Sequence, residues 1–170
     1  TAKKNIDFVS SLLSSSFVQP IKIGWVTTWN SRCGIATYSA HLIEHIQSEL
    51  SILAPDNEYI EDNHIEKNVT RCWTLGEDSL ERIYQNIINN NLTSVVIQFN
   101  YGFYDFIKLS NLIYDLRKIN INIIVLMHAT KDPIHDETKY LSSITNPLRL
   151  CKRIIVHTIS DLNRLKSLNL

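Results

Sequence analysis

The chain has 170 residues, which is enough for one domain with a real hydrophobic core. Seventeen basic and seventeen acidic side chains give a formal net charge of zero, so composition gives no indication of binding to nucleic acid or an anionic membrane surface. The cysteines are far apart and lack Cys-x-x-Cys spacing. This pattern indicates neither a disulfide framework nor a zinc site and is typical of reduced thiols in a cytosolic protein.

Residues 1–20 are predicted to lead into the domain. Apolar residues there are spaced as in a short amphipathic helix, and polar residues between them break the apolar run of about 7–15 residues that a signal peptide needs. They are Ile6, Val9, Leu13 and Phe17. The first residue is Thr1 and not Met, so we expect a trimmed or excised piece of a longer protein. No stretch approaches the ~20 apolar residues of a transmembrane helix.

Strands and helices are predicted to alternate after Pro20. Strands are expected at residues 21–27, 51–54, 69–75, 94–99, 121–127 and 153–157. Helices are expected at residues 35–50, 78–90, 104–119, 138–150 and 160–168. The polar, acidic segment 55–68 is expected to loop over the surface. The later strands are continuous apolar runs, which is typical of parallel strands covered on both faces. Residues 21–170 are therefore predicted to form an α/β domain, Rossmann-like, with a doubly wound parallel sheet and helices on both faces.

The strongest functional signal lies where the first strand runs into the first helix. A loop of this kind is at the carboxyl edge of a parallel sheet, where ligands bind. Free N–H groups at Cys33, Gly34 and Ile35 can point at an anion, and Gly34 has no side chain to block it. Arg32 adds a guanidinium suited to forked contacts with phosphate. The pattern predicts a site for a phosphorylated, polar ligand.

Three further loops are expected at the same edge, at residues 98–104, 128–136 and 157–161. In the first, Gln98, Asn100 and Tyr101 suit carbohydrate, because amides pair with hydroxyls and rings cover the apolar face of a pyranose. For Phe99 and Phe103, packing beneath the loop is an equally good interpretation. The convergence of such loops favours a sugar-phosphate ligand.

The other two loops contribute further candidates for the cleft. His128 ends a buried strand, a place where a histidine is more often structural than catalytic, and Thr130 and Asp132 follow it. Thr158 or Ser160 could cap the last helix, a role that competes with ligand binding. His135 and Asp136 have no third ligand at suitable spacing, so no metal is expected.

The residues from Thr27 to Ser39 read Thr-x-Trp-Asn-x-Arg-Cys-Gly-Ile-Ala-x-Tyr-Ser. This phrase resembles the opening of GT-B glycosyltransferases of the retaining group called family 4. Weaker similarity follows in Gln98–Tyr104, where Asn100 stands at a position that is commonly acidic in the family. The phrase Val-His-Thr-x-x-Asp-Leu from Val156 also resembles the family's corresponding strand and helix start.

The resemblance implies the N-terminal, acceptor-side domain of a GT-B enzyme, whose C-terminal donor-binding domain is absent from this chain. Such an enzyme transfers a hexose from a nucleotide sugar to a glycan or lipid-linked acceptor with retention, using no metal or other cofactor. The chain alone is expected to be inactive because catalysis needs both halves of the cleft. A cytoplasmic location follows, and the parent protein or its acceptor could bring it to a membrane.

The resemblance also implies roles for individual residues. His128 would position a hydroxyl of the donor sugar. Donor phosphate and sugar would meet the start of the first helix, at Arg32, Cys33, Gly34 and Ile35. The acceptor would meet Thr28, Trp29, Asn30, Gln98, Asn100 and Tyr101. Thr130, Asp132, Thr158 and Ser160 would line the rest of the cleft.

Two other functions remain open at this stage. One is a non-catalytic Rossmann-like module that binds a glycan or a partner, which the absence of a second domain favours. The other is a dinucleotide-dependent oxidoreductase, but no Gly-x-Gly-x-x-Gly follows the first strand.

Overall fold

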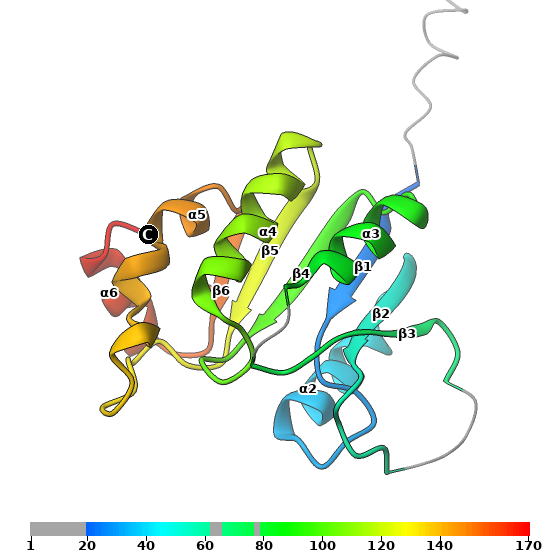
Figure 1. Cartoon of the computed structure of the whole chain (residues 1–170), viewed down its shortest axis with the longest axis horizontal. Coiled ribbons are helices and arrows are strands. Elements are labelled where there is room, and N and C mark those ends of the chain that lie inside the picture. Colours follow the sequence, from blue (N-terminus) through cyan, green and yellow to red (C-terminus); the bar gives the residue numbers. More distant parts are fainter. Residues whose placement is uncertain (1–19, 62–65, 77–78) are drawn as a thin grey trace, which may run out of the picture.

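A computed structural model describes residues 20–61, 66–76 and 79–170. The predicted helix over residues 6–17 lies outside them. The described residues form one parallel sheet of six strands in the order β3-β2-β1-β4-β5-β6 (Figure 1). The strands are β1 (Lys22–Val26), β2 (Glu49–Pro55), β3 (Val69–Trp73), β4 (Ser94–Phe99), β5 (Asn122–Met127) and β6 (Arg153–Val156). The Rossmann-like, doubly wound fold predicted from the sequence is confirmed.

Helices cover both faces of this sheet. They are α2 (Gly34–Ile43), α3 (Glu81–Asn89), α4 (Phe106–Lys118), α5 (Thr145–Arg149) and α6 (Ile159–Ser167). The chain moves from β1 to β2 in one direction and from β4 to β6 in the other. Right-handed crossovers therefore put α2 on one face and α3, α4 and α5 on the opposite face. Figure 1 shows α3 and α4 side by side, and the two helices are in contact.

The face under α3 and α4 holds the main hydrophobic core. Val26 and Leu53 of the sheet pack there with Ile83 of α3 and Leu116 of α4, all fully buried. Each such side chain contributes about 1.5–3 kcal/mol when it leaves water. The core lies directly behind the carboxyl ends of the strands and holds their loops in place.

Helix α2 buries only small residues on the other face. They are Ala36 and Ser39. The Ser39 hydroxyl shares a hydrogen bond of 2.7 Å with the Thr27 hydroxyl, and both side chains are fully buried. This contact ties the helix to the end of β1, so the start of α2 is fixed relative to the sheet edge.

The predicted helix over residues 35–50 is wrong in its second half. Helix α2 ends at Ile43, and β2 begins at Glu49. Glu49 and Leu50 pair in parallel with Lys22 and Ile23 of β1, and the Lys22 ammonium lies 3.2 Å from the Glu49 carboxylate. Backbone pairing with the central strand therefore outweighs the helical spacing of the apolar residues.

The predicted helix over residues 138–150 is broken into three short pieces. They are two 3₁₀ turns, Glu137–Lys139 and Leu141–Ile144, followed by α5. The break lies at Tyr140, whose backbone is extended with φ −80° and ψ 126°. Leu141 donates its N–H to the Asp132 carboxylate at 2.8 Å, so a side chain takes the place of a helical acceptor.

Within the described part of the chain, no helix has the length and apolar character needed to cross a membrane.

Candidate functional site

The carboxyl ends of β1, β4, β5 and β6 lie at one edge of the sheet, and the predicted site residues gather there. Two groups of contacts dominate this edge. One holds the loop between β1 and α2. The other links β4, β5 and β6 through Gln98, His128 and His157.

The start of α2 offers backbone donors, as predicted, but fewer than expected. Cys33 precedes the helix in an extended conformation and provides no side-chain cap. Its own N–H donates to the Ser31 carbonyl at 2.7 Å, so the predicted free N–H at Cys33 is wrong. Within the described chain, the N–H groups of Gly34 and Ile35 have no hydrogen-bond acceptor. A Cβ placed on Gly34 would meet nothing within 4 Å, so this helix end is open.

Arg32 stands beside this opening and is already paired. Its Nε donates to the Glu61 carboxylate at 2.9 Å, and its side chain is 85% exposed. A surface hollow of about 250 Å³ lies here, lined by Ser31, Arg32, Cys33, Glu58 and Tyr59. An ion pair this exposed contributes about 0–1 kcal/mol, so a bound anion can replace Glu61 at small cost.

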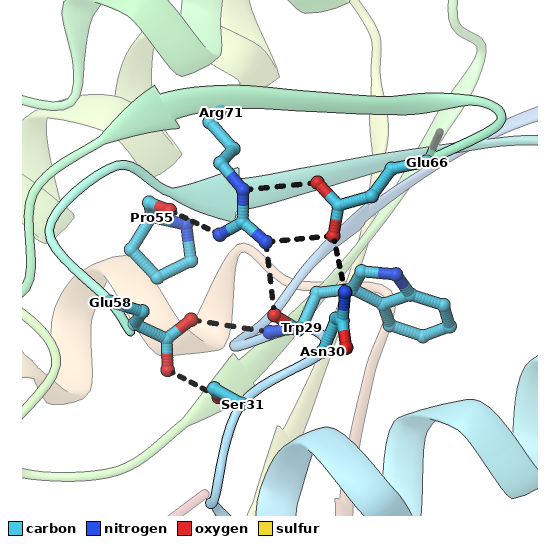
Figure 2. A network of polar contacts seen from close by, with 7 residues as sticks. All are labelled: Trp29, Asn30, Ser31, Pro55, Glu58, Glu66 and Arg71. Carbon is cyan, nitrogen blue, oxygen red and sulfur yellow. Dashed lines mark hydrogen bonds and ion pairs between the residues drawn. The ribbon is translucent and has the colours of Figure 1, made fainter. Parts of the chain in front are cut away.

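The loop after β1 is held by a group that we call the loop clamp, formed by Glu58, Glu66 and Arg71 (Figure 2). Arg71 of β3 donates through Nε and Nη2 to the Glu66 carboxylate at 3.1 and 2.8 Å. Its Nη2 also donates to the Trp29 carbonyl at 3.2 Å. Its Nη1 donates to the Pro55 carbonyl at 2.8 Å. The guanidinium thus joins β2, β3 and the β1–α2 loop.

The two carboxylates of the loop clamp hold the other side of the same loop. Glu58 accepts from the Trp29 N–H at 3.2 Å and from the Ser31 hydroxyl at 2.8 Å. Glu66 accepts from the Asn30 side-chain amide at 3.3 Å. Asn30 has φ +50°, a left-handed conformation that asparagine tolerates better than most residues. Thr28 is buried and donates to the Cys33 sulfur at 3.4 Å.

A chain of hydrogen bonds crosses the edge from β4 to β6. Gln98 Oε1 lies 2.6 Å from His128 Nε2, and His128 Nδ1 lies 3.2 Å from His157 Nε2. Gln98 is fully buried, His128 is half-buried and His157 is exposed. The Tyr38 ring of α2 packs edge-on against both imidazoles, with centroids 5.1 and 5.2 Å away.

Burial lowers the pKa of His128 to about 4, and the neighbouring His157 acts in the same direction. His128 is therefore neutral at physiological pH. A neutral imidazole with one donor and one acceptor nitrogen can orient a neighbour or bind a hydroxyl, but it brings no positive charge to a phosphate.

In the loop after β4, the side chains that were predicted to bind sugar, Asn100 and Tyr101, form hydrogen bonds within the chain instead. Tyr101 is 8% exposed, and its hydroxyl donates to the Asp132 carboxylate at 2.9 Å. Burial and this contact raise the pKa of Tyr101. The Asn100 side chain accepts from the Gly102 N–H at 3.1 Å. The Lys139 ammonium donates to the carbonyls of Tyr101 and Tyr104. These groups hold the loop in shape.

Thr130 and Thr158 both contact Asp161. The Thr130 hydroxyl donates to Asp161 at 2.5 Å and accepts from Arg164 at 2.6 Å. Thr158 caps α6 by accepting from the Asp161 N–H at 3.1 Å, and its hydroxyl donates to the Asp161 carboxylate at 2.6 Å. Hydrogen bonds from Thr130 and Thr158 hold the pKa of Asp161 below its usual range. Ser160 lies exposed in the first turn of α6.

Sequence reasoning missed the loop clamp at this edge. It placed the loop 157–161 here but did not name His157 as a candidate site residue. His157 could have been found, because it directly follows β6 just as His128 directly follows β5. The acidic residues of the segment 55–68 were predicted only to lie in a surface loop, with no partner assigned to them. No pattern in the sequence shows which strand provides their cationic partner, Arg71.

No group of three or more residues able to bind a metal occurs within the described ranges. No protein-family model matches this chain. A comparison with curated proteins also finds no match.

Proposed function

We propose that this chain is the N-terminal, acceptor-side domain of a retaining glycosyltransferase with a GT-B fold. One observation carries the proposal. Tyr38 lies one turn beyond Gly34 and packs on His128 and His157, so the open start of α2 and the histidines belong to one site. Such a site pairs anion-binding amides with a neutral group suited to a sugar hydroxyl.

The start of α2 would bind phosphate of a nucleotide-sugar donor. The N–H groups of Gly34 and Ile35 have no acceptor in the described chain, and the positive end of the helix dipole favours an anion there. Arg32 would exchange Glu61 for the donor phosphate and stabilise the leaving diphosphate. This chemistry needs no metal in the proposal.

The pair of imidazoles, His128 and His157, would lie at the transferred hexose. The low pKa of His128 keeps that ring neutral, which suits a hydrogen-bonded pair that contacts a hydroxyl better than proton transfer at pH 7. The hollow beside Arg32 and Tyr59 would be open to the acceptor, with Trp29 and Asn30 held nearby by the loop clamp. The second domain would supply most contacts to the nucleotide.

A non-catalytic glycan- or partner-binding module is the alternative. The observation that favours it is the internal use of predicted ligand groups. Gln98, Tyr101 and Thr130 are all buried and bonded to other residues of the chain. A module that only binds a ligand would need fewer side chains with unused hydrogen-bonding atoms than an enzyme that must also position reacting groups.

The parent protein can decide between the two. It would be purified from its source cells with an antibody against this domain, and incubated with UDP-hexoses or GDP-hexoses plus the source glycolipid fraction. Release of nucleoside diphosphate together with sugar transfer, lost in a Gly34→Val parent, is expected. Binding of a glycan by the wild-type parent with no turnover of any nucleotide sugar would favour the binding module instead.

A further inference from the structure

His128 has no ring nitrogen left for a ligand. Its Nε2 faces Gln98 Oε1 at 2.6 Å, and its Nδ1 faces His157 Nε2 at 3.2 Å. His157 is exposed at the end of β6 and uses only Nε2 in this chain of contacts. Within the described residues, His157 Nδ1 has no hydrogen-bond partner. It is therefore the ring nitrogen of this pair that remains available to a ligand.

The direction of the hydrogen bonds follows from the amide of Gln98. With Oε1 turned toward the ring, as here, the amide only accepts, so His128 carries its proton on Nε2. Among the described residues Gln98 Nε2 is buried with no hydrogen-bond partner, so the amide orientation is the premise that the tautomer measurement below tests. The Nδ1 lone pair of His128 then accepts the Nε2–H of His157. In neutral His157 the remaining nitrogen, Nδ1, is an acceptor. The buried β4 residue thus sets the proton positions on two rings in turn.

The rings are also fixed in orientation. Tyr38 packs edge-on against both, with interplanar angles of 88° to His128 and 87° to His157. The two imidazole centroids are 4.9 Å apart. Because α2 carries Tyr38 and begins at the open Gly34, the His157 ring lies against the helix that provides the open backbone donors.

We propose that His157, and not His128, contacts the ligand at this edge, accepting a hydrogen bond from a carbohydrate hydroxyl through Nδ1. His128 and Gln98 are positioning residues that fix the proton and the orientation of His157. The carbohydrate class rests on the proposed function. The hydrogen-bond direction rests on the orientation of the Gln98 amide, with Oε1 facing His128. A ligand that contacts His157 through phosphate alone would contradict the carbohydrate assignment.

The test uses the ¹⁵N-labelled chain and long-range ¹H–¹⁵N spectra of its imidazoles near pH 7.5. We expect both His128 and His157 to carry the proton on Nε2. Gln98→Leu should release His128 into a mixture of tautomers, whereas His157→Gln should leave the His128 tautomer unchanged. A proton on His128 Nδ1 in the wild-type chain would overturn the proposed direction and the positioning role of Gln98.

Ligand contact is read in the same spectra, with millimolar UDP-glucose, UDP-N-acetylglucosamine, GDP-mannose and the free sugars as probes. The His157 Nδ1 resonance should shift on binding while the His128 resonances move little. His157→Ala should weaken binding about tenfold, which corresponds to about 1.4 kcal/mol. His41→Ala, at a 74% exposed histidine elsewhere on α2, is the matched control and should bind normally.

Three outcomes overturn the ligand assignment. A shift at His128 with His157 unmoved would return the contact to His128. If UDP without a sugar, added as a further probe, shifts the His157 resonances as far as UDP-glucose does, phosphate and not carbohydrate is the ligand. If no probe moves either ring while the parent protein still transfers sugar, the ligand contact at His157 fails and the proposed function stands. The tautomer measurement decides the positioning part separately.

Discussion

Replacement of Arg71 by methionine tests whether the loop clamp holds the β1–α2 loop. Exposed ion pairs contribute about 0–1 kcal/mol. Breaking a buried pair costs about 3–5 kcal/mol. The Arg71 and Glu66 side chains are 17% and 18% exposed, so their pair lies between these limits. Arg71→Met should lower the free energy of unfolding by about 2 kcal/mol, because Glu66 and the Trp29 carbonyl lose their main donor.

Urea denaturation followed by tryptophan fluorescence measures this loss. Arg71→Lys should lose about half as much, since an ammonium keeps the charge but not the fork. A double-mutant cycle with Glu66→Gln should give a coupling energy of about 1 kcal/mol or more. Arg32→Met is the matched control, because its pair with Glu61 is far more exposed and should contribute under about 1 kcal/mol.

Loss of the Arg71 side chain should also have a local consequence. The Trp29 N–H, which donates to Glu58, should exchange with solvent faster in Arg71→Met as the loop opens more often. Equal stability of Arg71→Met and Arg32→Met, with zero coupling to Glu66 and unchanged exchange at Trp29, would refute the idea that these contacts hold the loop.

Three further predictions concern single positions. Gly34→Val should leave the free energy of unfolding within about 0.5 kcal/mol, because its side chain enters open space, yet abolish nucleotide-sugar binding in a calorimetric titration of the parent protein; unchanged affinity would contradict the assignment. The pKa of His128 is lowered from 6.5 to about 4, so its contribution to stability is complete above pH 6.5 and is lost as pH falls toward 4. The free energy of unfolding, measured by urea denaturation at several pH values across that range, should depend less on pH in His128→Gln than in the wild-type chain. An identical pH dependence would count against a neutral, half-buried His128 ring. Desolvation of the half-buried Cys151 thiol raises its pKa to about 12, so mass spectrometry should find it unmodified after iodoacetamide at pH 8, and rapid labelling would contradict the raised pKa.

The alternation of elements in the fold could be predicted because each strand is a compact apolar run. Strand β4 was placed at its observed bounds, residues 94–99. The errors lie where tertiary contacts outweigh local spacing. Residues 49 and 50 follow a helical pattern but pair with β1, and Asp132 captures the Leu141 N–H to break a predicted helix.

The candidate site was predictable only in its location. Parallel topology brings Gln98, His128 and Thr158 to one edge, and chain order alone implies this. Which atoms remain free for a ligand depends on contacts between distant segments. Gln98 and His128 are 30 residues apart, and Arg71 and Trp29 are 42 apart, so no local pattern could show that these groups are already paired.

The small side chains of Ala36 and Ser39 act as spacers that set the height of α2 above the sheet. That height fixes two things together: how far the amides of Gly34 stand from the strand ends, and how Tyr38 meets the paired imidazoles. A larger residue in place of Ala36 or Ser39 would push α2 away from the sheet. The Gly34 amide and the Tyr38 ring would then move together. In the proposed site, the anion-binding amides and the histidine alignment therefore depend on the same helix, so a change in its position would alter both.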